Sequence, residues 1–118
     1  MEIPPTREDI RGGAIDLSPA RTLLERIVAR WNPEEIWLFG SRARGTGTPD
    51  SDWDLLVVVP NGTPDSERDS FAVWEVTKRS GVGSDVVIVT RDEFEEDRTV
   101  TNTVQYETAH FGVRLYER

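Results

Sequence analysis

The spacing of apolar residues in the first third of the chain is that of a helix. From residue 20 to residue 31, apolar side chains recur every three or four positions, which predicts an amphipathic helix with one buried face. Ser18-Pro19 suits the start of this helix and Asn32-Pro33 suits its end. The predicted buried face consists of Ala20, Leu23, Leu24, Ile27, Val28 and Trp31.

Short apolar runs farther along the chain predict β-strands instead. The run "EIWLF" at residues 35–39 is a short strand that ends at Gly40. Residues 55–59 and 86–89 are unbroken aliphatic runs rich in valine, which is typical of strands buried on both faces. The tail "GVRLYE" at residues 112–117 favours one more short strand.

Two further helices are expected on either side of the strand at residues 86–89. The second helix follows Thr63-Pro64 and ends at the glycines after residue 80. Its apolar face consists of Phe71, Trp74 and Val73. A third helix is predicted by residues 90–93, "TRDE", which match a capping box. We expect a break in it near residues 98–101, where threonine and valine cluster.

Helices that alternate with buried aliphatic strands predict an α/β fold, with a small mixed sheet packed with helices. Residues 18–118 form one domain in this interpretation. Residues 1–17 carry prolines, a Gly-Gly pair and mixed charges without periodicity, so we expect a flexible arm or a partner-contacting extension there.

Composition narrows the class of protein. The chain of 118 residues is 36% hydrophobic and 31% charged, which suits a soluble globular protein and excludes a disordered one. It lacks an apolar run near the roughly 20 residues of a membrane-spanning helix, and its start lacks a secretory signal pattern, so a cytoplasmic location is expected. The net charge of −8 argues against direct nucleic-acid binding.

Two acidic residues lie at the entrance of the buried run at residues 55–59. Asp52 and Asp54 are two positions apart, so in a strand both carboxylates point to the same face, whereas Trp53 points into the core. Carboxylates this close repel each other unless a cation lies between them. Hard oxygen ligands with open positions for substrate phosphates are the pattern expected for Mg²⁺.

A third acid opens the run at residues 86–89. If that strand neighbours the strand at residues 55–59, Asp85 comes close to Asp52 and Asp54. Three converging carboxylates can bind two Mg²⁺ ions, the arrangement used for phosphoryl displacement. In this scheme Asp85 is the candidate to accept the proton of the attacking hydroxyl.

The segment between the first two strands has the features of a phosphate-binding turn. Gly40 permits a sharp turn, and a short helix that begins near Ser41 would point backbone N–H groups at an anion. Arg42 or Arg44 can form charge-assisted hydrogen bonds to phosphate oxygens. The sequence is not a Walker loop, because it has no Gly-Lys-Ser/Thr. Alone, each of these features is most often a turn or a solvated loop; their conjunction in one order favours a site.

This conjunction resembles the minimal nucleotidyltransferase (MNT) family, a branch of the superfamily that includes DNA polymerase beta. The shared pattern is Gly-Ser-x-Ala-Arg-Gly, a loop, and then Ser-Asp-x-Asp-Leu; here it stands as "GSRARG" at residues 40–45 and "SDWDL" at residues 51–55. The third family acid falls on Asp85. The resemblance implies a polymerase beta-like nucleotidyltransferase fold over residues 18–118.

The resemblance also implies an activity: Mg²⁺-dependent transfer of a nucleoside monophosphate, most simply AMP from ATP, to a hydroxyl. Minimal members work beside a helical HEPN protein, often a ribonuclease toxin, for which they are the antitoxin, and some adenylylate that toxin on tyrosine. Two alternatives stay open. The chain could be a non-catalytic antitoxin that covers its partner, or it could modify a small molecule such as an antibiotic, with the acceptor pocket completed across a homodimer.

Overall fold

The computed structural model describes residues 3–118, and all bounds below refer to that part of the chain. The strands and helices follow one another along the chain without a repeated unit. The strands are β1 (Thr6–Glu8), β2 (Ala14–Asp16), β3 (Glu35–Phe39), β4 (Trp53–Val59), β5 (Ser84–Thr90) and β6 (Val113–Glu117), and the helices are α1 (Arg21–Trp31), α2 (Gly40–Arg44), α3 (Ser70–Thr77), α4 (Arg91–Asp97) and α5 (Val104–Phe111).

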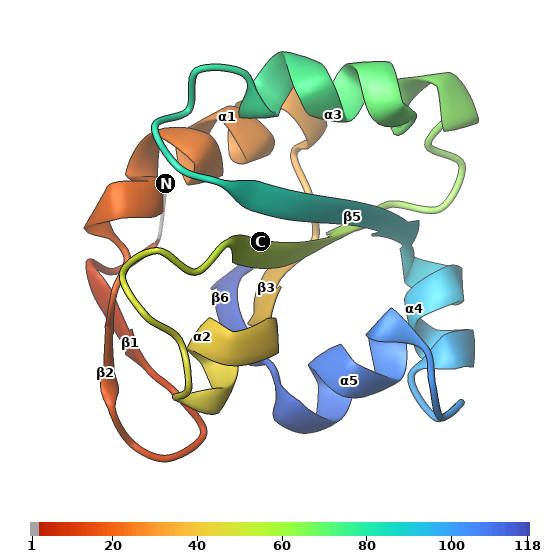
Figure 1. The fold of residues 1–118 in the computed structure, drawn as a ribbon. Helices are drawn as coiled ribbons and strands as arrows, with labels where there is room; N and C mark the ends of the chain where they lie inside the picture. Colours follow the sequence, from red (N-terminus) through yellow and green to blue (C-terminus); the bar gives the residue numbers. More distant parts are fainter. Residues whose placement is uncertain (1–2) are drawn as a thin grey trace.

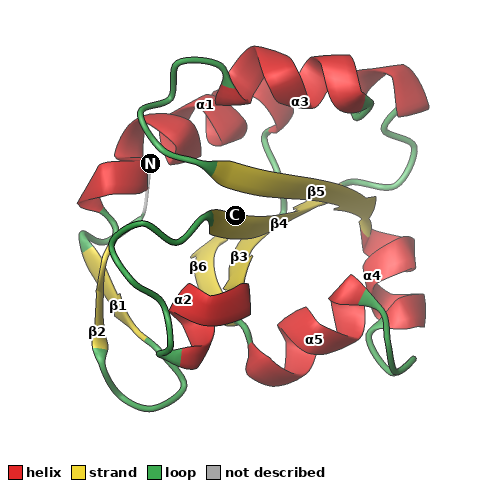
Figure 2. Cartoon of the chain, in the orientation of Figure 1, coloured by secondary structure: helices red, strands yellow, loops and turns green. Residues whose placement is uncertain are grey.

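A mixed sheet lies at the centre of the molecule and is covered on both faces. In the described residues its four strands have the order β5-β4-β3-β6, and β1 pairs with β2 in a separate hairpin. Helices α1 and α3 cover one face, and α2, α4 and α5 cover the other (Figure 1). Colouring by secondary structure makes the three layers plain (Figure 2). The predicted α/β class with a small mixed sheet is confirmed.

Strand β4 organises the sheet. It pairs antiparallel with β3 and parallel with β5, and the connection from β4 to β5 carries α3. Residues 55–59 have no exposed surface, as the unbroken aliphatic run predicted. Burying each such side chain contributes about 1.5–3 kcal/mol relative to leaving it exposed. This buried segment fixes the strand firmly enough to hold charged residues at its entrance.

The two faces of β4 have separate cores because successive side chains point in opposite directions. Trp53, Leu55 and Val57 pack toward α1 and α3, and Trp53 is 1% exposed, as predicted for its position between the acids. Leu56 and Val58 pack on the other face, where Phe94 of α4 joins them. The even-numbered face of β4 is therefore the one that continues into Asp54.

The N-terminal segment differs from the flexible arm that we expected. Residues 3–17 include the β1–β2 hairpin, and Ile3, Ile15 and Leu17 are buried in the core. Arg7 ties the hairpin to β6, because its guanidinium donates hydrogen bonds to the carbonyls of Arg114 and Leu115 at 3.2 Å. A few buried residues at irregular spacing gave no periodic signal, so the sequence did not reveal the hairpin. Residues 1–2 of the expected arm lie outside the described part.

Helix α3 presents a different face to the core from the predicted one. Its cap is Asp69, whose carboxylate accepts a hydrogen bond from the Ala72 N–H at 2.9 Å. In this register Ala72 and Val76 face α1, while Phe71 and Trp74 are 62% and 53% exposed. The expectation that these two aromatics form the buried face was therefore wrong. Small residues at i and i+4 are buried instead.

Helix α4 begins as the capping box predicted. The Thr90 hydroxyl accepts a hydrogen bond from the Glu93 N–H at 3.2 Å, and the Glu93 carboxylate accepts one from the Thr90 N–H at 2.8 Å. The expected break follows, because α4 ends at Asp97 and α5 begins at Val104. Nowhere in residues 3–118 is a helix both long and apolar enough to cross a membrane.

Candidate active site

The parallel pairing of β4 with β5 brings two of the predicted acids side by side. Asp54 is the direct register partner of Asp85, so both side chains leave the sheet on the same face. Asp52 lies two residues before Asp54, at the entrance of β4, and its carboxylate lies against Gly83 in the loop before β5. The structure therefore brings all three predicted acids to one end of two neighbouring strands.

The pKa of Asp54 is affected by its burial and by the nearby acidic side chains. Burial raises its pKa above the ordinary value of 3.8, and the negative charges of Asp85, Asp52 and Glu107 raise it further. Each of these charges disfavours ionisation of the Asp54 carboxyl group. A cation at this place would reverse the effect.

The donor set fits a divalent cation in its chemistry. The carboxylates of Asp52, Asp54 and Asp85 supply hard oxygen atoms, the ligands that Mg²⁺ prefers. As the side chains now lie, no group of three or more acidic, histidine or cysteine residues within 3–118 is close enough together to hold an ion. A bound cation would offset the mutual repulsion of these carboxylates.

The Gly-Ser turn packs directly against this acidic end. Gly40 has a φ of +74°, which favours glycine, and a Cβ at this position would collide with the Asp54 carboxylate. The turn thus needs glycine both for its backbone conformation and for the close approach of Asp54. Helix α2 starts at Gly40, as predicted for a short helix near Ser41. Within the described residues the Ser41 side chain makes no hydrogen bond, so its hydroxyl is free for a ligand.

The two arginines of α2 have different surroundings. The Arg42 guanidinium donates hydrogen bonds to the carbonyls of Ser51 and Pro49 and stacks on the Trp53 ring with its centre 4.2 Å from the ring centroid. It holds the loop at residues 45–52 in place, so its predicted role as a phosphate ligand competes with these contacts. Arg44 instead lies over the Phe111 ring at 5.1 Å and is nearly half exposed.

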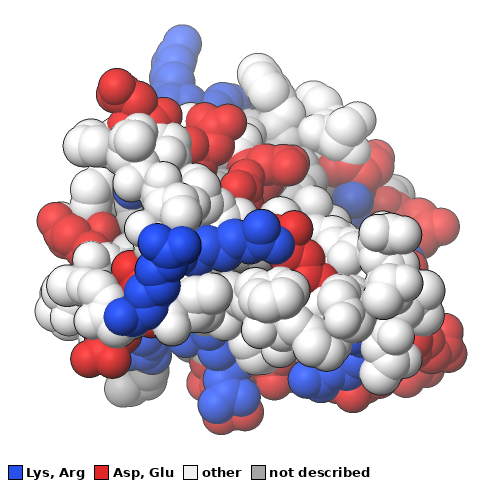
Figure 3. Space-filling view, turned by 60° about the horizontal axis from the view of Figure 1, so that its bottom comes forward, with Lys and Arg blue, Asp and Glu red and all other residues white. Residues whose placement is uncertain are grey.

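Glu107 is a site residue that the sequence did not indicate. It comes from α5, and its carboxylate accepts a hydrogen bond from the Gly40 N–H at 3.2 Å. Its other carboxylate oxygen lies 3.4 Å from an Arg44 guanidinium nitrogen. No motif marks it, because α5 reaches the site only through the packing of helices on the sheet. On this face of the molecule, basic and acidic side chains lie close together (Figure 3).

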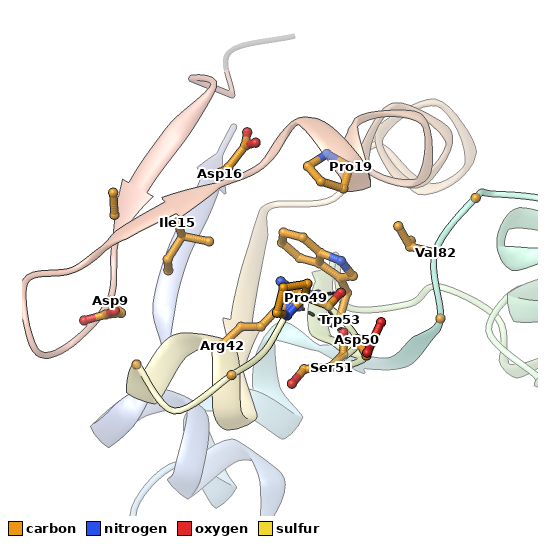
Figure 4. Close-up of a pocket in the computed structure, with 15 residues that line it drawn as sticks. Asp9, Ile15, Asp16, Pro19, Arg42, Pro49, Asp50, Ser51, Trp53 and Val82 are labelled. Carbon is orange, nitrogen blue, oxygen red and sulfur yellow. Dashed lines mark hydrogen bonds between the residues drawn. The ribbon is translucent and has the colours of Figure 1, made fainter.

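A large cavity lies apart from the three acids. It has a volume of about 790 Å³ and lies between the β1–β2 hairpin, the loop at residues 45–51 and the loop at residues 81–83. Figure 4 shows Arg42 and Trp53 together at its floor, with Asp50 and Ser51 beside them. None of the residues at positions 52, 54 and 85 lines it. We therefore place the chemistry at the acidic end of the strands and not in this cavity.

Comparison with known proteins identifies the class. The chain belongs to the nucleotidyltransferase domain family, whose model matches residues 20–110. A protein from Sulfolobus solfataricus assigned as a nucleotidyltransferase, with a crystal structure at 1.40 Å, is similar in structure. The two sequences are 26% identical and the structures match with a TM-score of 0.55. The match covers 86% of this chain and 80% of that one. A structure of a toxin–antitoxin with AMP-PNP shares the fold at 20% identity and a TM-score of 0.52, over 81% of this chain and 72% of that one. No curated protein matches the chain.

Proposed function

We propose that the protein transfers AMP from ATP, with Mg²⁺, to a hydroxyl on a partner protein. The observation that carries the proposal is the register of the two parallel strands, which sets Asp54 opposite Asp85. The Gly40-Ser41 turn lies directly against Asp54. A gathering of carboxylates beside a free serine hydroxyl and the backbone of a sharp turn is the combination that a metal-bound triphosphate requires.

Each predicted residue except Arg42 contacts the metal or the nucleotide in this proposal. Asp52, Asp54 and Asp85 hold the metal, which when bound offsets the negative charge of the phosphates and of the three carboxylates. Gly40 and Ser41 orient the triphosphate through the backbone of the turn and the serine hydroxyl. Arg44 is the better placed of the two arginines to reach a phosphate oxygen, because Arg42 is engaged with the loop carbonyls.

The reaction is a displacement at the α-phosphorus of ATP. The acceptor oxygen forms a bond to this phosphorus while the bond to the bridging oxygen of the β-phosphate breaks, so pyrophosphate leaves. The hydroxyl proton passes to the Asp85 carboxylate, which is exposed at the start of β5 and can release it to solvent. Atoms and charge balance without any further reactant.

Two observations away from the site itself support a protein acceptor. One structural neighbour is a toxin–antitoxin with AMP-PNP, so this fold occurs in a partnered protein with an ATP analogue. On the other face of the sheet, Phe71 and Trp74 form an exposed aromatic pair with ring centroids 5.9 Å apart. Such a pair suits contact with another protein. We propose a helical HEPN-type toxin as the partner, with this chain as its antitoxin.

The test is transfer of labelled AMP to the partner. The protein is incubated with α-labelled ATP, Mg²⁺ and the product of the neighbouring gene, and we expect the label on that product. Absence of label with all four nucleoside triphosphates, on a partner shown to bind, contradicts the proposal. If Asp54→Asn still neutralises the partner fully in cells, the protein acts by covering its partner and not by catalysis.

A further inference from the structure

Glu107 occupies an unusual position for an acidic side chain. It extends from α5 to the end of the sheet where Asp52, Asp54 and Asp85 already lie, and its negative charge acts on Asp54. A fourth carboxylate at this place increases the repulsion among the acids. It is held there by the Gly40 N–H at 3.2 Å and by Arg44 at 3.4 Å.

These two partners are the groups that the proposed function assigns to the nucleotide. The Gly40 N–H opens the proposed phosphate-binding turn, and Arg44 is the motif arginine that is not bonded to the carbonyls of the loop. A carboxylate resembles a phosphate in charge and in its accepting oxygens, and both bind arginine in the same geometry. Glu107 therefore makes, inside the molecule, the contacts that an incoming phosphate needs.

We propose that Glu107 is an internal competitor of the nucleotide phosphate, which occupies the Gly40 turn and Arg44 when the site is empty and leaves them when a triphosphate binds. The inference rests on the proposed function. Glu107 keeps the turn and Arg44 in position in the absence of nucleotide, and it lowers the affinity for nucleotide because its contacts must first be broken.

The surroundings allow this exchange. The Glu107 and Arg44 side chains are 35% and 45% exposed, so their ion pair is only weakly held and can open. Beside them lies a hollow of about 530 Å³ whose lining includes Arg44, Asn102, Tyr106 and Phe111. The Glu107 side chain can turn into this space without disturbing the core, because the hollow is open to solvent at the surface of α5.

The experiment measures the affinity for AMP-PNP with Mg²⁺ by isothermal titration calorimetry. Glu107→Gln removes the charge of the side chain, and Glu107→Ala removes its contacts. Each variant should bind AMP-PNP about threefold to tenfold more tightly than the wild type. This is the range expected from the loss of a partly exposed ion pair with one hydrogen bond. Glu75→Gln is the matched control. It removes the same charge from an exposed position on α3, on the opposite face of the sheet, and should leave the affinity unchanged.

A second measurement follows the contact itself. The Gly40 amide resonance should shift in Glu107→Ala without nucleotide, and in the wild type on addition of AMP-PNP, because both remove the carboxylate from the Gly40 N–H. Equal affinity in the wild type and both variants overturns the inference and leaves the proposed function intact. Weaker binding in Glu107→Gln also overturns it, since Glu107 then assists the nucleotide or its metal. Failure of all three proteins to bind AMP-PNP overturns the proposed function and the inference together.

Discussion

At the entrance of β4 and β5, Asp52, Asp54 and Asp85 gather with Glu107, and Arg44 is the cation that lies near them. At the opposite end of the same strands, acidic side chains are matched by arginines. Glu93 lies 2.7 Å from Arg68, and Arg91 lies 2.8 Å from Glu34, 3.4 Å from Glu35 and 3.0 Å from Glu95. The two ends therefore place similar side chains in opposite electrostatic surroundings.

The pKa shifts at the two ends run in opposite directions. The hydrogen bond from the Thr90 N–H lowers the pKa of Glu93 below its ordinary value, and Arg68 adds to this effect. Burial and three neighbouring acids raise the pKa of Asp54. The matched end stabilises the fold, whereas the unmatched end carries the negative charge that the proposed metal would offset. This unmatched charge distinguishes the proposed binding site from the structural ion-pair network at the other end.

The largest expected effect is the loss of transfer when the unmatched end is neutralised. Asp54→Asn and Asp85→Asn should each lower the rate of AMP transfer by about a thousandfold or more, since each removes charge that the reacting phosphates and metal require. The rate is measured with α-labelled ATP at saturating partner. Asp92→Asn is the control at the matched end of the strands, and its rate should stay within about twofold of the wild type. A large loss of transfer rate in Asp92→Asn, or a normal transfer rate in Asp54→Asn, would contradict the proposed difference between the two ends.

The next largest effect is expected on the Tm of Asp54→Asn, which should depend on whether the metal is present. Because the folded-state pKa of Asp54 is raised, its protonation stabilises the fold; that gain is full below the ordinary pKa of 3.8 and is lost as the pH rises through the raised folded-state pKa. At pH 7 the ionised carboxylate is therefore unfavourable, and Asp54→Asn should raise the Tm of the metal-free protein.

Addition of Mg²⁺ and AMP-PNP should reverse this order of stability. Ligand at a hundred times its Kd stabilises the wild type by about 2.7 kcal/mol, and Asp54→Asn should gain much less. Thermal unfolding at pH 7, with and without both ligands, checks both statements. A metal-free Asp54→Asn protein that melts below the wild type would show that Asp54 has a stabilising partner.

The smallest effect is expected at the matched end. Glu93→Ala should cost about 1 kcal/mol at pH 7, from the lost cap and a partly exposed ion pair, after allowance for solvent screening. Since the folded-state pKa of Glu93 is lowered, this stabilisation is present above its ordinary pKa of 4.5 and is lost as the pH falls through the folded-state pKa. Urea unfolding at pH 7 and at pH 3 measures the difference. A cost that stays constant between these pH values would contradict the sign of the shift.

The acidic end of the sheet could be predicted from sequence because its geometry follows from the period of a strand. Asp52 and Asp54 share a face by their spacing, and Asp85 joins them as soon as the two aliphatic runs are neighbours. The capping box at Thr90 is equally local. These features need no knowledge of how distant helices pack.

The features that escaped prediction depend on packing between distant segments. Glu107 reaches Gly40 across 67 positions in the chain, through the placement of α5 on the sheet. The loop-holding role of Arg42 depends on the path of the loop over Trp53. The spacing of Phe71 and Trp74 predicts the apolar face of their helix, whereas the cap at Asp69 sets the register that turns both side chains outward. None of these contacts has a signature in the local order of residues.

The central claim is that the unmatched carboxylates at the entrance of β4 and β5 bind the metal that accompanies the nucleotide. A crystal structure of the protein with AMP-PNP and Mn²⁺ tests it most directly, because the anomalous signal of manganese locates the ion directly. We predict a peak between Asp52, Asp54 and Asp85, with the triphosphate against Gly40 and Ser41. Manganese at the opposite end of the strands, beside Glu93 and Arg91, would contradict this prediction. Nucleotide in the cavity beside the β1–β2 hairpin, with no metal at the three acids, would also contradict it.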